Sequence, residues 1–174
     1  MRSFHVVACA LLLGSAAVSE AATPAGAIVC TGSAGALSFN VSFFDIGLAN
    51  PTDVGSSSSG AGAGKVTFQP FVIHAALSSF PKLFEAAATG THFSSCTLTT
   101  QDSSGGSMEF RLSQVLVQSV NAIASSATSH APRFAYVKAD MAFGAVEVRT
   151  STGVDDGGSS PNSSGWNRVT NSGS

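Results

Sequence analysis

Charged side chains are scarce in this 174-residue chain. Only 10 % of its residues are Asp, Glu, Lys or Arg, and the formal net charge is −2. Attraction to nucleic acid or to anionic lipid depends on a dense field of Lys and Arg. We therefore expect neither a nucleic-acid partner nor a charged membrane surface as a partner.

Short catalytic motifs are also missing. The chain contains no G-x-S-x-G nucleophile elbow, no H-E-x-x-H zinc motif and no paired C-x-x-C. His74, His92 and His130 are each isolated, so a metal site would need ligands from distant segments. We expect a protein that is not an enzyme and that has no cofactor and no metal.

One enzymatic alternative stays open. A secreted hydrolase on a β-sandwich would use Asp45, Glu109 or Asp140 together with a histidine. That hypothesis requires two such groups within hydrogen-bonding reach of each other in a cleft.

The main apolar run, Val6 to Val18, lies at the N-terminus. It follows one Arg and precedes Ser19-Glu20-Ala21, which is the layout of a secretory signal peptide. No later stretch approaches the roughly 20 apolar residues of a membrane span. We expect residues 1–21 to be a signal peptide cleaved near Ala21, leaving a secreted, extracellular protein without a membrane segment.

Cysteine is rare, with three residues in the chain. Cys9 belongs to the leader, so Cys30 and Cys96 remain as an even pair in an oxidising compartment. They form a candidate disulfide; the alternative is two separate buried thiols.

Alternating residues predict several β-strands. In the stretch 37–43, Leu37, Phe39, Val41 and Phe43 fall on one face. Strands are also expected at 66–74, with an edge or bulge at Pro70, and at 95–101, 108–120 and 134–150. The apolar phase changes near residues 113–114 and again after Ala145, and such changes favour curved strands in a small barrel or closed sandwich.

One short α-helix is expected, from about Phe80 to Thr89. Ser78 or Ser79 can cap it, Pro81 suits its first turn, and Gly90 supplies a C-terminal stop.

Three residues near or after this helix are candidates for function. His92 follows the helix end, where an imidazole can hydrogen-bond the last carbonyls, and we favour this structural role over catalysis. Glu85 is interpreted as a first-turn charge rather than a general acid. Trp166 is either a recognition anchor or, as we favour, part of a loose segment.

Gly and Ser dominate the loop 50–64 and the tail 151–174, which are too polar to form a core. We expect a barrel domain over 22–150 and a disordered tail over 151–174. Asn40 and Asn162 begin glycosylation acceptor motifs, which matter in a eukaryotic host.

The order of these segments resembles a known family. The runs are LSFNVSFFDIG, GAGKVTFQPFVI, PKLFEAAATGTHF, CTLTTQ, MEFRLSQVLVQSV and MAFGAVEVR. Together they are similar to the Hcp family, the haemolysin-coregulated proteins of type VI secretion.

The resemblance implies a mainly β fold, a small Hcp-like barrel of two sheets with one helix at its side. It places four helix residues in the core: Leu83, Phe84, Ala87 and Ala88. It implies non-catalytic subunits that form six-membered rings, stack into the type VI tube and in some cases shelter small effectors.

Because tube subunits have no cleaved leader, we expect a secreted, non-catalytic Hcp-like protein that acts by self-assembly into a ring or by binding an effector or a surface target. The alternative within the family is a true type VI tube or effector-carrier protein.

Overall fold

The structure is a computed structural model of the chain. It describes residues 24–33, 35–50, 66–101, 103, 105–125, 134–151, 162–170 and 172–173. The expected signal peptide and most of the Gly/Ser loop lie outside the described residues.

Most of the described chain is β-structure, with one α-helix. The strands are β1 (Gly26–Gly32), β2 (Gly35–Asp45), β3 (Leu48–Ala49), β4 (Thr67–Phe68), β5 (Phe71–Ala75), β6 (His92–Gln101), β7 (Ser107–Ser125), β8 (Phe134–Ala142), β9 (Ala145–Ser151), β10 (Asn162–Asn167) and β11 (Ser172–Gly173). A 3-10 turn, η1 (Leu77–Ser79), leads into the helix α1 (Phe80–Thr89).

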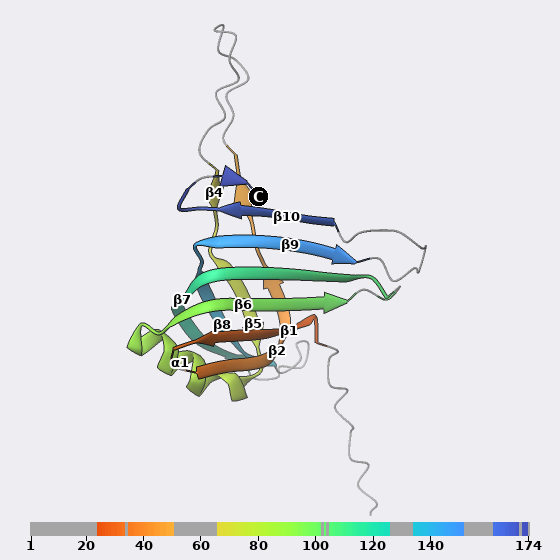
Figure 1. Ribbon diagram of the computed structural model, residues 1–174. Helices are drawn as coiled ribbons and strands as arrows, with labels where there is room; N and C mark the ends of the chain where they lie inside the picture. The colour runs from red at the N-terminus through yellow and green to blue at the C-terminus, as the bar shows by residue number, and fades with distance from the viewer. Residues whose placement is uncertain are drawn as a thin grey trace, which may run out of the picture.

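Six antiparallel strands form one broad surface, which we call the front wall. Their order is β10-β9-β7-β6-β1-β2, and Figure 1 shows them one above the other. The front wall therefore has β10 near one end and β2 at the other.

The sheet closes into a barrel because β7 is long enough to pair twice on one edge. Its first part pairs with β9 and its second part pairs with β8. Since β8 also pairs with β5, and β5 with β2, the strands β7, β6, β1, β2, β5 and β8 form a closed ring. The expected barrel is confirmed, and β9, β10 and β11 extend its wall.

The change of apolar phase in β7 marks the point where this strand bends. Phe110 and Leu112 are buried before the bend, and Val115 and Val117 are buried after it. Between them Gln114 has a φ of 54°, which is unusual for a residue with a side chain. The positive φ resets the alternation, as the sequence pattern predicted.

The expected inward face of β2 is wrong at Phe43. Leu37 and Val41 are buried, but the register between β2 and β5 shifts between Val41 and Phe43. This bulge turns Phe43 outward, where its side chain is 48 % exposed, and brings Phe44 against the core.

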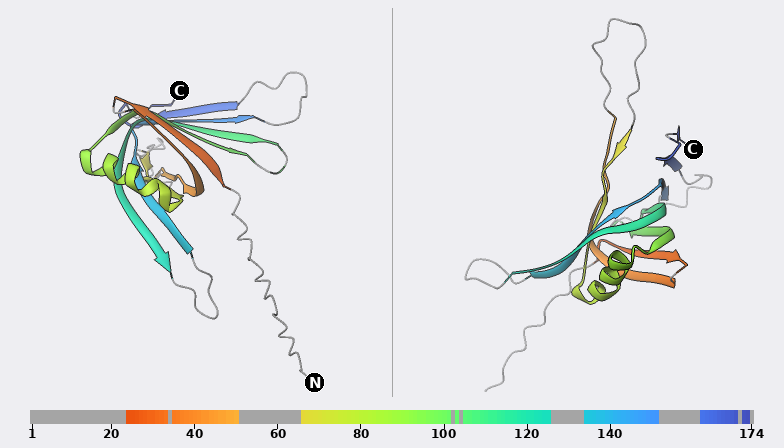
Figure 2. Two further views of the ribbon diagram at one scale, coloured as in Figure 1. Left: turned by 90° about the horizontal axis from the view of Figure 1, so that it is seen from below. Right: turned by 90° about the vertical axis from the view of Figure 1, so that its left-hand side faces the viewer.

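Pro70 separates two strands. The expected strand over 66–74 is divided into β4 and β5, since proline cannot donate to a sheet ladder. β4 pairs with β3 as a separate two-stranded ribbon, and Figure 2 (right) shows it directed away from the barrel.

The helix has the expected bounds and stop signal. Ser79 is its N-cap, although its side chain makes no capping hydrogen bond, and Pro81 lies in the first turn. Gly90 has a φ of 64°, and its N–H and that of Thr91 bond to the final carbonyls of α1.

The tail from residue 151 was expected to be disordered, and this expectation is wrong for the part of the tail that the structure describes. Ser151 belongs to β9, and residues 162–167 form β10, which pairs with β9 along its whole length. The segment has few apolar side chains, but a free sheet edge supplies hydrogen bonds that do not depend on side-chain type.

Candidate functional site

The expected disulfide joins the middle of two neighbouring strands of the front wall. Cys30 of β1 and Cys96 of β6 are register partners, with Cα atoms 3.9 Å apart and a sequence separation of 66 positions. Both side chains are fully buried. The bond thus fixes β1 to β6 inside the core.

The helix covers the barrel with fewer residues than expected. Leu83 is fully buried and Ala87 is partly buried, in agreement with the prediction. Phe84 is 56 % exposed and Ala88 is exposed, so both were wrongly placed in the core. Ala86 is buried instead, which the sequence did not predict, because the large apolar side chain of Phe84 was assumed to mark the buried face of the helix.

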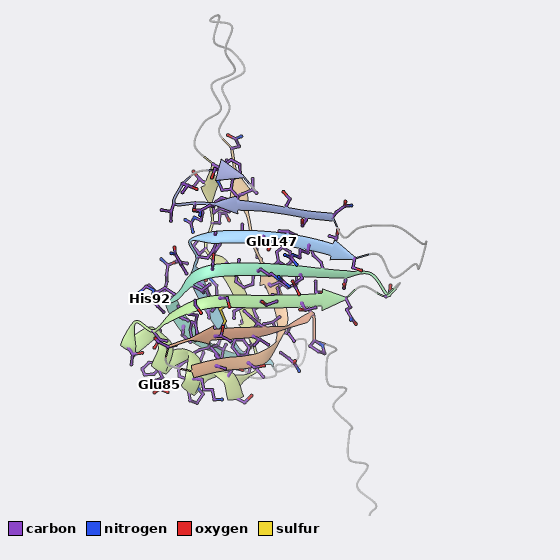
Figure 3. All side chains as sticks on the ribbon, viewed as in Figure 1. Glu85, His92 and Glu147 are labelled. Atoms are coloured by element: carbon purple, nitrogen blue, oxygen red, sulfur yellow. A yellow bond between two sulfur atoms is a disulfide. The ribbon has the colours of Figure 1, made fainter. Side chains whose placement is uncertain are left out.

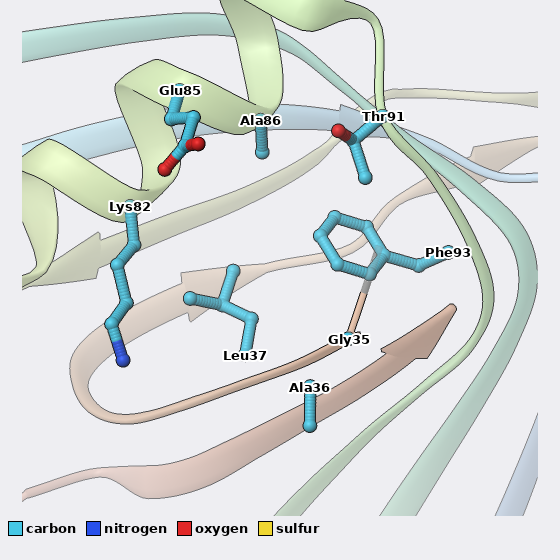
Figure 4. A pocket seen from close by; sticks show the side chains of 8 residues that line it. All are labelled: Gly35, Ala36, Leu37, Lys82, Glu85, Ala86, Thr91 and Phe93. Atoms are coloured by element: carbon cyan, nitrogen blue, oxygen red, sulfur yellow. The ribbon is translucent and has the colours of Figure 1, made fainter. Parts of the chain in front are cut away.

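A pocket of about 230 Å³ lies between α1 and the first residues of β2. Its floor is apolar, formed by Leu37, Ala86 and Phe93, and its rim carries Lys82 and Glu85 (Figure 4). The first turn of α1 contains no acidic residue, and Glu85 lies in the second turn. The first-turn interpretation of Glu85 was therefore wrong.

His92 begins β6 and is exposed (Figure 3). Its neighbour across the sheet is Leu116. The carbonyls at the end of α1 already accept bonds from Gly90, Thr91 and the Thr89 hydroxyl, so the capping role predicted for His92 is taken by other groups.

Asp140 has polar partners of its own on the outer face of the barrel. Its Oδ2 accepts a hydrogen bond of 2.7 Å from Ser119, and its Oδ1 lies 3.5 Å from Lys138 Nζ. Glu109 forms an ion pair with Arg111. Within the described ranges no histidine is hydrogen-bonded to Asp45, Glu109 or Asp140, so the geometry required by the hydrolase hypothesis is not found there.

His74 is the centre of an aromatic row on the same outer face. Its ring centroid lies 4.8 Å from that of Phe43 and 4.5 Å from that of Tyr136. Burial by these rings lowers the pKa of His74 below 6.5; the Lys138 cation adds to this, and the Asp140 carboxylate opposes it. This row of rings could not be predicted from the sequence, because the alternation of β2 placed Phe43 on the inward face.

Four charged residues neutralise one another on β7 and β9. Glu109 faces Arg149 across the strands, and Arg111 faces Glu147. Each strand also has an internal ion pair, with 2.8 Å between Arg149 Nε and Glu147 Oε1. The hydrogen bond to Glu147 raises the pKa of Arg149. Figure 3 labels Glu147 on β9, and this part of the wall carries no net charge.

Arg168 fastens the C-terminal segment to the barrel. Its Nη1 donates to the Phe143 carbonyl at 2.8 Å, and its guanidinium lies 5.0 Å from the Phe143 ring and 5.7 Å from the Phe68 ring. Trp166, expected in a loose segment, lies on β10 and packs against the core.

Both candidate glycosylation residues are exposed. Asn40 lies on β2 and Asn162 begins β10. Among the described residues no group of three or more His, Cys, Asp or Glu side chains is placed to hold a metal ion. The only α-helix there, α1, is too short to cross a membrane.

These features define a closed β-barrel protein with one lateral helix and an extended wall of paired strands. The family described as "Type VI secretion system effector, Hcp" matches residues 30–148, more than half of the chain. The chain belongs to this family. No curated protein matches the chain.

Solved structures show the same fold at low sequence identity. One described as a type six secretion system protein is 19 % identical, with a TM-score of 0.68, covering 86 % of this chain and 99 % of that one. Hcp1 from Salmonella typhimurium is 16 % identical, with a TM-score of 0.60 and coverage of 86 % and 99 %. A type VI secretion system effector from Yersinia pestis is 12 % identical, with a TM-score of 0.56 and coverage of 82 % and 98 %.

Proposed function

We propose that this chain is a non-catalytic subunit that assembles with copies of itself into a closed ring, and that the rings stack as tube and effector carrier of a type VI secretion system. The family match across residues 30–148, nearly the whole barrel, carries this proposal. The self-neutralised charges of Glu109, Arg111, Glu147 and Arg149 support it, because like subunits with such a surface do not repel one another.

The experiment that tests assembly is a mass measurement with negative-stain imaging across a concentration series. The protein should begin at Ala22, so that the leader-like segment does not interfere. We expect closed rings of the size of about six subunits, as in the family, since identical subunits favour closed symmetry. A strictly monomeric species at all concentrations would contradict the proposal.

A second candidate is a ring that works outside a type VI tube, as a secreted protein that binds an effector or a surface target. The leader-like sequence of residues 1–21 favours it. Sequencing the N-terminus of protein recovered from the host's culture medium separates the two. A chain beginning near Ala22 favours the general export route, and one beginning at Met1 favours the type VI route.

A further inference from the structure

A cleft separates the ribbon of β3 and β4 from the strands β9 and β10. Figure 2 (right) shows the ribbon in yellow and these two strands in blue, as separate layers beside the barrel. The cleft between the two layers has a volume of about 270 Å³. It is therefore close to the lower end of the size range of small-molecule pockets, roughly 300–1,000 Å³.

Strand register directs apolar side chains into the cleft from both layers. Register partners in an antiparallel pair share one face. On the ribbon, Leu48 pairs with Phe68, and both line the cleft. On the other layer, Trp166 of β10 pairs with the buried Val146 of β9, so the indole lies on the same face as Val146. The cleft is thus enclosed by two apolar faces.

The charge of the lining excludes an ionic ligand. None of the residues that line the cleft carries a charged side chain. A carboxylate or an ammonium group placed there would lose its water without gaining a counter-charge, which is costly. Leu48, by contrast, is 65 % exposed, and an apolar ligand that covered it would remove this surface from water.

Trp166 supplies the one polar contact that selects among uncharged ligands. Its Nε1 is closed off from solvent and has no hydrogen-bond partner among the described residues. An enclosed N–H without an acceptor is unfavourable, and an oxygen atom within the cleft would satisfy it. Gly173 leaves room beside the ring for the small shift that this requires, since a Cβ there would lie 3.4 Å from Cε3 and Cζ3 of the indole.

We propose that this cleft binds an uncharged, mainly apolar small molecule that carries a carbonyl oxygen. The apolar part lies between Leu48 and Val148, and the oxygen accepts the hydrogen bond of Trp166 Nε1. All the residues that line the site belong to one chain, so the inference does not depend on the proposed ring.

The first test uses 2-octanone as the probe and octanoate as its charged counterpart of equal chain length. Trp166 is the only tryptophan of the chain, so its fluorescence reports on the cleft. Titration of the protein that begins at Ala22, followed by fluorescence and calorimetry, should saturate at one ketone per chain. Octanoate should bind at least about tenfold more weakly. No saturation up to the solubility limit of the ketone, or equal binding of octanoate, would overturn the inference.

The second test locates the site with two variants on one strand. Ser164 pairs with Val148 and faces the cleft, whereas Ser163 pairs with Arg149 on the opposite face of β10, and both serines are exposed. Ser164→Phe should fill the cleft and abolish binding of 2-octanone. Ser163→Phe, the matched control, should bind the ketone as the parent does, and both should keep the parent's circular dichroism spectrum. Binding retained by Ser164→Phe, or lost from both variants, would overturn the location.

Trp166→Phe tests the hydrogen bond without filling the cleft. The substitution keeps an aromatic ring and removes the N–H, so the calorimetric affinity for 2-octanone should fall about threefold to tenfold, the effect of one hydrogen bond. An unchanged affinity would overturn the role assigned to Nε1.

Mass measurement at the same protein concentrations separates this site from the proposed ring. A chain that stays monomeric and binds 2-octanone would contradict the ring and support the site. An affinity that falls in step with self-association would show that a second copy covers the cleft, and would overturn the small-molecule site.

Discussion

Removal of the Cys30–Cys96 bond should cause a large loss of stability in this chain. A cross-link that spans 66 residues restricts the unfolded chain by about 4 kcal/mol in the loop-entropy relation, with measured losses of about 2 to 5 kcal/mol. Cys30→Ala with Cys96→Ala is the better variant. Serine would place two hydroxyls in a fully buried site and add a separate cost.

The measurement is equilibrium urea unfolding of the protein that begins at Ala22, with and without reductant. We expect the oxidised parent to exceed the double-alanine variant by about 4 kcal/mol, and reduction to remove most of that difference from the parent alone. A loss of less than about 1 kcal/mol in the variant, well below the usual range, would refute a stabilising role of the bond. Free thiols found at both positions of the native protein by alkylation and mass analysis would refute the bond itself.

Three smaller perturbations test the rest of the structure. Leu83→Ala should cost about 2 to 5 kcal/mol by creating a cavity, whereas Phe84→Ala should cost less than about 1 kcal/mol because its ring is mostly exposed; equal losses in urea unfolding would contradict the placement of the helix. Gly32→Ala should lower the unfolding free energy by about 1 to 3 kcal/mol, because its Cβ would lie 2.6 Å from the His92 carbonyl oxygen, and a neutral effect would show that β1 lies farther from β6. Because the folded-state pKa of His74 lies below the unfolded value of 6.5, unfolded chains bind more protons between the two values, so stability should fall as pH drops below 6.5; comparison with His74→Gln should show this slope only in the parent.

Alternating apolar residues, together with the residues that begin and end the helix, were enough to predict the barrel and α1. The phase change in β7 was visible because buried residues stand on both sides of it, and the structure places the unusual φ of Gln114 there. The bounds of α1 followed from Pro81 and Gly90, whose backbone preferences do not depend on distant contacts.

Features that depend on neighbours across the sheet could not be predicted in the same way. Phe43 fits the alternation of β2, and only the register with β5 reveals the bulge that turns it outward. The order of β10 depends on the free edge of β9 and on the contacts of Arg168 with Phe68 and Phe143. The local sequence of a segment rich in Ser, Asn and Gly does not indicate which distant strand or aromatic rings it will contact.

The length of β7 has a mechanical consequence. One continuous strand of 19 residues runs through both the barrel and the extended wall, pairing with β6 and β9 in its first part and with β8 in its second. Hydrogen bonds in an antiparallel sheet lie perpendicular to the strands, so a push along the strands is resisted by many bonds in shear at once. The bonds would break one after another only if the strand were peeled sideways. A barrel built around such a strand resists a force along β7 more strongly than a force across it.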